Sequence, residues 1–177
     1  DVSINSLHLT DVDIGYFNSA MRLSPPLRQQ TDRDALRAGL ADGTLDALVS
    51  DHTPVEADAK ALPFAEAEPG ATGLELLWSL ALKWAQDERV PLARALERLT
   101  TGPARVLGPS LGNLHGSVGQ LTVGGVADLV LLSEAGHWAV ADARLRSQCK
   151  STPFSGYELP GRVLATLVGG HIAYEAS

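Results

Sequence analysis

The chain of 177 residues carries 14 basic and 21 acidic side chains, a formal charge of −7, and 45% of its residues are hydrophobic. This apolar content is too high for a disordered segment, and the length is sufficient for one good core. An acidic chain without a basic run repels a phosphate backbone, and no apolar stretch approaches the roughly 18 residues of a membrane span. We therefore expect neither nucleic acid nor a membrane as a partner.

The cysteine content and the first residues indicate what kind of protein the chain comes from. A single cysteine, Cys149, excludes a disulfide framework within the chain and a cysteine-based zinc finger. The chain starts at Asp1 without an initiator methionine or a secretory signal pattern, as if inside a strand. We expect a fragment of a longer, cytoplasmic protein.

The first quarter of the chain predicts a strand, a helix and a second strand. Apolar and polar residues alternate over residues 2–9, which indicates a strand, whereas two prolines keep residues 24–28 extended. A helix is predicted from Thr31 or Asp32 up to Gly43, and residues 45–50 then form a short buried strand. A helix followed by a buried strand is typical of α/β folds.

A long loop and further helices follow. Residues 51–70 contain three prolines, and an irregular stretch of this length is often functional. An apolar stripe predicts a helix over residues 72–85, and Pro91 opens another that continues to residue 99. Residues 104–108 form a further short helical turn.

From about residue 112 the pattern changes to glycine-rich turns and short β-branched runs. We place a boundary near residues 108–116, with an α/β part over residues 1–111 and a mostly β part over residues 112–177. Gly169-Gly170 suits a two-residue hairpin turn. The predicted strands include Val118 and residues 121–123, 127–132, 138–140, 162–168 and 171–174.

The sharpest candidate site is Ser50-Asp51-His52, where a buried strand ends and the long loop begins. In parallel α/β folds, active sites form at this edge. A carboxylate there can bind a metal or take a proton from metal-bound water. The alternative is that Asp51 caps a turn and that His52 is a partly exposed loop residue.

The other histidines give weaker signals. His8 faces either a barrel interior or solvent, and the remaining three are expected on the surface. No two histidines have the spacing of a metal-ligand pair. Cys149 is expected to be a structural or surface thiol. The three surface histidines are His115, His137 and His171.

A series of short motifs runs along nearly the whole chain. In this order they resemble the C-terminal part of a dihydroorotase, a member of the amidohydrolase superfamily. The motifs are Leu9-Thr10-Asp11, Ser24-Pro25-Pro26-Leu27-Arg28, Asp42-Gly43-Thr44-Leu45-Asp46-Ala47, Ser50-Asp51-His52-Thr53-Pro54, Leu62-Pro63-Phe64, Gly73-Leu74-Glu75, Pro103-Ala104-Arg105, Ala127-Asp128-Leu129-Val130, Thr152-Pro153-Phe154 and Val168-Gly169-Gly170.

The resemblance implies an α/β fold: the C-terminal portion of a (β/α)8 TIM barrel, followed by the C-terminal strands of a small β-sandwich. Residues 1–111 would hold about strands 6–8 of the barrel and their helices, and residues 112–177 the C-terminal share of the sandwich. Active members of the family bind zinc and interconvert carbamoyl aspartate and dihydroorotate in pyrimidine biosynthesis.

The family's site residues carry over only in part. Asp51 matches the aspartate that follows the last barrel strand, which implies a zinc ligand and proton shuttle, and His52 matches a substrate-binding position. Val55 stands where the family has a histidine that contacts the substrate carboxylate, and Ser24 replaces an asparagine. The scaffold motifs of the family are therefore retained, whereas the positions that bind metal or substrate are changed.

The chain also has fewer of the metal-ligating residues than the family pattern. Asn5 and Ser6 stand where the resemblance places two histidines, one of them a metal ligand. His8 lies two or three positions away, and a shift of two residues moves a strand side chain by roughly 6–7 Å, so it is a poor substitute. We expect zinc to be absent or weakly bound.

Three functions follow from the resemblance. The first is a catalytically inactive, dihydroorotase-like protein that acts as a structural partner of aspartate transcarbamoylase. The second is an active zinc dihydroorotase with a reduced site, and the third a related cyclic amidohydrolase such as a hydantoinase or allantoinase. Open barrel edges also predict association with a missing N-terminal half or with another copy of the chain.

Overall fold

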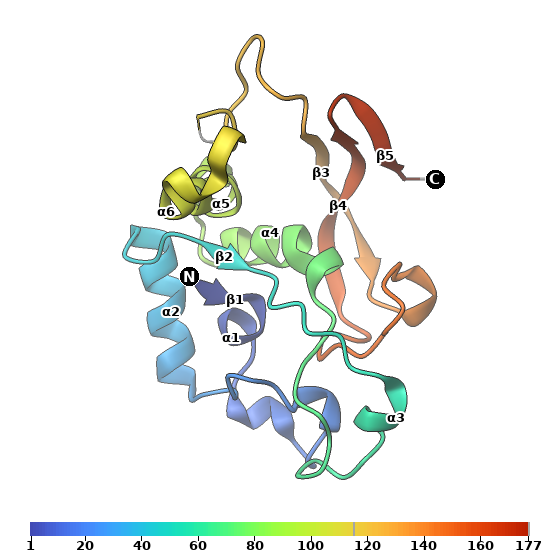
Figure 1. The fold of residues 1–177 in the computed structure, drawn as a ribbon. Helices are drawn as coiled ribbons and strands as arrows, with labels where there is room; N and C mark the ends of the chain where they lie inside the picture. The colour runs from blue at the N-terminus through green and yellow to red at the C-terminus, as the bar shows by residue number, and fades with distance from the viewer. Residues whose placement is uncertain (115, 177) are drawn as a thin grey trace.

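The structure is a computed structural model, which describes residues 1–114 and 116–176. A helical α/β part comes first and a three-stranded sheet follows it (Figure 1). The helices are α1 (Ile4–His8), α2 (Gln30–Asp42), α3 (Ala57–Lys60), α4 (Leu77–Asp87), α5 (Leu92–Leu99) and α6 (Thr101–Leu107); the strands are β1 (Val2–Ser3), β2 (Leu48–Val49), β3 (Leu129–Ala139), β4 (Glu158–Val168) and β5 (His171–Glu175); and 3-10 turns are η1 (Asp11–Ile14), η2 (Ser19–Met21), η3 (Leu74–Leu76), η4 (Gly108–Leu114) and η5 (Asp142–Arg144).

Strands β1 and β2 form a short parallel pair, as an α/β fold requires. Val2 lies opposite Leu48, and the Val2 amide donates to the Ala47 carbonyl at 3.0 Å. Among the described residues, these two parallel strands pair directly with each other, and the assignment of about three barrel units to this part stays a prediction. The proline-bearing stretch between them is irregular, because proline lacks the N–H that a strand ladder needs.

The strand predicted over residues 2–9 is wrong after its second residue. Residues 4–8 form helix α1, whose N-cap is Ser3: its hydroxyl accepts a hydrogen bond from the Asn5 amide at 3.1 Å. Ile4 and Leu7 are both fully buried. Their spacing of three places them on one helix face, whereas a strand would direct them to opposite faces. The alternation at residues 2 and 4 and at residues 7 and 9 fits a strand, and an apolar run this short does not distinguish the two structures.

Helix α2 confirms the prediction, with a start slightly earlier than expected. Gln29 is the N-cap, and Asp32 acts from the third helical position by accepting a hydrogen bond from the Gln29 amide at 3.2 Å. Gly43 ends the helix in the left-handed region at φ 101°, which glycine adopts without a Cβ clash.

Helix α4 lies at the centre of the molecule and joins its two parts (Figure 1). Leu80 and Trp84 are fully buried, and the helix lies against β4. The Ser79 hydroxyl donates to the Gly161 carbonyl at 3.1 Å, and the Trp78 indole donates to the Ser133 carbonyl at 3.2 Å. The predicted helix over residues 72–85 begins as η3 and continues as α4 to Asp87.

The second part is an antiparallel sheet in the order β3-β4-β5. The hairpin predicted at Gly169-Gly170 is confirmed, since both residues have positive φ (55° and 82°) between paired Val168 and His171. Two predicted strands, over residues 127–132 and 138–140, are instead one irregular strand, β3, with register shifts. The described residues of this part form a single sheet, and the small sandwich that the resemblance implies stays a prediction.

The strands predicted at Val118 and residues 121–123 are wrong. These residues lie in turns, and Leu121 and Val123 are largely exposed. β-branched residues favour strands only where a neighbouring strand and a buried face are available, and this segment has neither among the described residues. Within the described ranges, no helix combines the length and the apolar character needed to cross a membrane.

Candidate functional site

Asp51 follows β2 directly and lies at the carboxyl end of the parallel pair. Its backbone is left-handed (φ 49°), which is uncommon for a residue with a side chain and typical of constrained sites. The Ser3 hydroxyl donates to Asp51 Oδ2 at 2.7 Å, and the Asn5 side-chain amide approaches the same oxygen at 3.4 Å. The carboxylate is therefore held by neutral donors from β1 and α1.

Asn5 occupies one of the two positions where the resemblance places histidines. Its side chain is buried (4% exposed) and is directed at Asp51, whereas Ser6 is half-buried and makes no hydrogen bond to the carboxylate in the described structure. An amide nitrogen donates a proton and has no lone pair for a metal. This contact thus serves the carboxylate as a hydrogen-bond donor and cannot continue a metal-ligand set.

His52 anchors the start of the long loop. Its Nδ1 accepts hydrogen bonds from the Gly73 and Leu74 amides at 3.2 and 3.3 Å, so a neutral ring carries its proton on Nε2. A Cβ built on Gly73 would lie 2.3 Å from the Ser50 carbonyl oxygen, which shows how closely the two segments approach. His52 therefore has a structural role at the site edge.

Val55 and Ser24, the two other changed positions, make no hydrogen bond to Asp51 in the described part of the chain. Val55 is buried (4% exposed) and lies beside Gly70, where it fills apolar space. Ser24 lies exposed ahead of the two prolines. Their predicted place in substrate binding stays a prediction.

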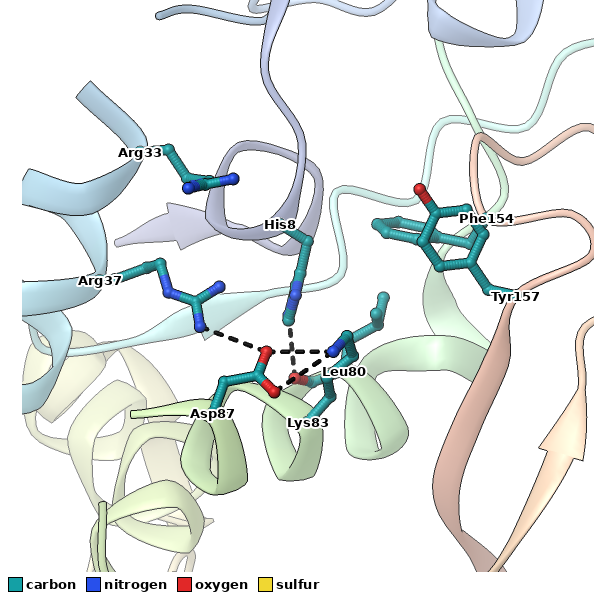
Figure 2. Close-up of a pocket in the computed structure, with 8 residues that line it drawn as sticks. All are labelled: His8, Arg33, Arg37, Leu80, Lys83, Asp87, Phe154 and Tyr157. Atoms are coloured by element: carbon teal, nitrogen blue, oxygen red, sulfur yellow. Dashed lines mark hydrogen bonds and ion pairs between the residues drawn. The ribbon is translucent and has the colours of Figure 1, made fainter. Parts of the chain in front are cut away.

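His8 is turned toward helix α4 (Figure 2). Its Nε2 lies 2.9 Å from the Leu80 carbonyl oxygen, and its ring meets the Phe154 ring edge-on at 6.2 Å. Burial, and next the positive charge of Arg37, lower the pKa of His8 to about 4, so the ring is neutral at pH 7. In the described structure the ring is thus engaged by α4 and Phe154.

The residues near Asp51 do not fit a zinc ion by themselves. Zinc sites in proteins use three or four thiolate, imidazole or carboxylate ligands. Across residues 1–114 and 116–176, no group of three or more histidine, cysteine, aspartate or glutamate side chains could hold a metal. At the carboxyl end of the β1–β2 pair, Asp51 is the one acidic residue that the sequence analysis proposed as a ligand. Its hydrogen-bond partners, Ser3 and Asn5, are neutral.

The remaining candidates lie on the surface or serve structure. His137 and His171 are exposed, as predicted, and His115 lies outside the described residues. The Cys149 thiol points to Glu56 Oε1 at 3.7 Å; partial burial, and next the Glu56 carboxylate, raise the pKa of this thiol. A thiol with a raised pKa is a weak nucleophile.

Ser3 is the site residue that the sequence reasoning missed. A serine directly before an apolar run is an N-cap signal, and here the same hydroxyl also binds Asp51. Because residues 2–9 were predicted to form a strand, no helix was expected for Ser3 to cap.

Comparisons with known proteins place these features in a family context. The sequence pattern of the amidohydrolase family matches residues 6–173. A dihydroorotase-like protein of Pseudomonas aeruginosa is 43% identical over 99% of this chain and 40% of its own length. A dihydroorotase of Anaeromyxobacter is 40% identical over 99% of this chain and 39% of its own. The chain thus spans about two fifths of these relatives.

Solved structures share the fold. An L-hydantoinase of Arthrobacter aurescens superimposes with a TM-score of 0.84 at 28% identity, over 98% of this chain and 38% of that one. A D-hydantoinase gives a TM-score of 0.87 at 21% identity, also over 98% and 38% of the two chains. At 21% identity, this second likeness concerns the fold alone.

Proposed function

The chain belongs to the amidohydrolase family, and from that premise we propose that it is part of a dihydroorotase-like protein that has lost the dihydroorotase reaction. The whole protein would act as a structural partner of aspartate transcarbamoylase, in the cytoplasm, in pyrimidine biosynthesis. Names of relatives that contain "dihydroorotase-like" and the retained scaffold motifs support this proposal.

One observation carries the proposal: the neutral donors on the Asp51 carboxylate. In the family resemblance, Asp51 holds zinc together with histidines, and a zinc-bound hydroxide needs the zinc. Here the Ser3 hydroxyl and the Asn5 amide engage Oδ2 instead. Asn5 stands at a position where the resemblance places a histidine, and Ser3 lies two residues before it, so this end of the site satisfies the carboxylate without a cation.

The loss at Val55 supports the same proposal from the substrate side. A histidine there can donate a hydrogen bond to a substrate carboxylate, whereas valine cannot. The Val55 side chain is also buried against the loop. Metal binding and substrate binding would therefore be weakened together, while the fold is kept.

The test uses the complete protein that contains this chain, assayed for closure of carbamoyl aspartate with zinc added. We expect no turnover, and we expect co-purification with aspartate transcarbamoylase. Asp51→Ala should leave that association unchanged, because the carboxylate would have no catalytic task. Turnover comparable to that of ordinary dihydroorotases, or failure to associate, would refute the proposal.

An active zinc dihydroorotase, or a related cyclic amidohydrolase of the hydantoinase or allantoinase class, is the second candidate. It is favoured by the retained Asp51-His52 pair at the strand end and by the likeness to an L-hydantoinase at 28% identity. Metal analysis separates the two candidates. About one zinc per chain, together with turnover that Asp51→Ala abolishes, would establish the second.

A further inference from the structure

A cavity of about 210 Å³ lies between helices α1, α2 and α4 and the loop before β4 (Figure 2). Asp51 is not among its lining residues, so it is separate from the candidate site. Its walls come from four segments far apart in the sequence, including His8, Arg37, Lys83 and Phe154. A cavity assembled in this way can surround a small ligand on several sides.

Positive charge predominates in the cavity wall. Arg33 and Arg37 of α2 and Lys83 of α4 face it, and the one carboxylate in the lining is Asp87. Asp87 is already engaged, since it accepts from Lys83 at 3.0 Å and from Arg37 at 3.3 Å. Arg37 and Lys83 thus share one internal counter-ion.

Two further acids pair with the arginines. Arg33 pairs with Asp34 at 2.9 Å, and Arg37 pairs with Glu88 at 2.5 Å. The side chains of Asp34 and Glu88 are 53% and 41% exposed, so water screens both pairs. Arg33 is the more exposed of the two arginines (26% against 12% for Arg37), so an anion in the cavity competes most easily with the Arg33 pair.

Neutral groups complete the wall. The Tyr157 phenol makes no hydrogen bond within the described residues, and its ring lies edge-on to Phe154 at 5.5 Å. Burial, and next the Asp13 carboxylate, raise the pKa of Tyr157, so it remains an O–H donor at pH 7. The cavity therefore offers guanidinium, ammonium and phenol donors beside an aromatic surface.

We propose that this cavity binds a small oxyanion, a phosphate or a carboxylate, through Arg33, Arg37 and Tyr157. Planar guanidinium groups match the geometry of both anions, and charge-assisted hydrogen bonds in a partly buried cavity are stronger than at the surface. Arg33 is the adjustable member, because its ion pair is with the adjacent, exposed Asp34. This binding site does not depend on the proposed function.

The experiment titrates the full chain with inorganic phosphate and with acetate, by calorimetry at constant ionic strength with chloride as the reference salt. Saturable heat with either anion supports the proposal, and the stronger of the two identifies the source as phosphate or carboxylate. Arg33→Gln should weaken binding about tenfold, because one charge-assisted hydrogen bond is lost. Arg33→Lys, which retains the charge, should weaken it less.

Arg28→Gln is the matched control, since Arg28 lies just before α2, outside the cavity lining, and its side chain is 72% exposed. It should bind phosphate or acetate as the unmodified chain does. Absence of saturable binding by both anions, or equal loss in Arg28→Gln and Arg33→Gln, would overturn the proposal. Circular dichroism of each variant verifies that the fold is retained.

Discussion

At the scale of single residues, Ser3 links the backbone to the candidate site. Its hydroxyl accepts from the Asn5 amide at the start of α1 and donates to Asp51 Oδ2. The sequence predicted the place of Asp51, because a strand end followed by a long loop is recognisable. It could not predict Ser3 as its partner, since that contact joins residues 48 positions apart.

Ser3→Ala should therefore lower the free energy of unfolding by about 1–2 kcal/mol, because both the helix cap and a hydrogen bond to a carboxylate are lost. Urea denaturation of the full chain measures it. Ser6→Ala is the control, since Ser6 is also half-buried but has neither bond in the described structure. Equal losses in the two variants would contradict the double role of Ser3.

His8 predicts a pH dependence. Its folded pKa of about 4 lies below its ordinary value of 6.5, so the unfolded chain binds the extra proton first. The contribution to stability is complete above pH 6.5 and is lost as the pH falls toward 4. It amounts to at most about 3 kcal/mol by linkage.

The measurement compares unfolding free energies from pH 7 down to pH 4. His8→Gln should remove this part of the pH dependence, whereas His171→Gln, at an exposed strand end, should retain it. The carboxylates titrate in all three proteins, so the difference isolates His8. Identical pH profiles for His8→Gln and the unmodified chain would refute the assignment.

At the scale of elements, local sequence determines some pieces and packing determines others. Helix α2 and the β4–β5 hairpin were predictable, because residues with strong local preferences mark their ends. Asp32 and Gly43 cap the helix, and Gly169-Gly170 forms the hairpin turn. The structure of residues 4–8 and 118–123 was not predictable, because their short apolar runs are compatible with several structures. Tertiary packing determines which of these forms.

Alanine substitutions at two glycines separate the effect of close packing, at Gly73, from the effect of helix propensity, at Gly39. Gly73→Ala should destabilise the chain by about 2–3 kcal/mol, since the new Cβ would lie 2.3 Å from the Ser50 carbonyl and push His52 away from its amide partners. Gly39→Ala, in the middle of α2, meets Leu45 only at 3.5 Å and should stabilise by up to about 1 kcal/mol. Thermal unfolding measures both; a neutral Gly73→Ala would contradict the close packing.

At the scale of the whole molecule, the parallel pair has unpaired edges. Two strands of two residues each cannot close a barrel, and open edges pair with other strands. We predict that the chain associates with a further part of its protein or with another copy of itself. Light scattering after size exclusion should give a mass above 18.6 kDa that depends on concentration. A monodisperse species at 18.6 kDa would refute this prediction.

Helix α4 has a consequence for how the molecule opens. It lies against α1 on one side and β4 on the other, and its side chains bond to carbonyls of β3 and β4. The helical α/β part and the sheet cannot separate without exposing the same buried helix, so both should melt in a single cooperative transition. Amide hydrogens of α4 should then exchange with solvent most slowly in the chain, and slow exchange confined to either part alone would show that the two open independently.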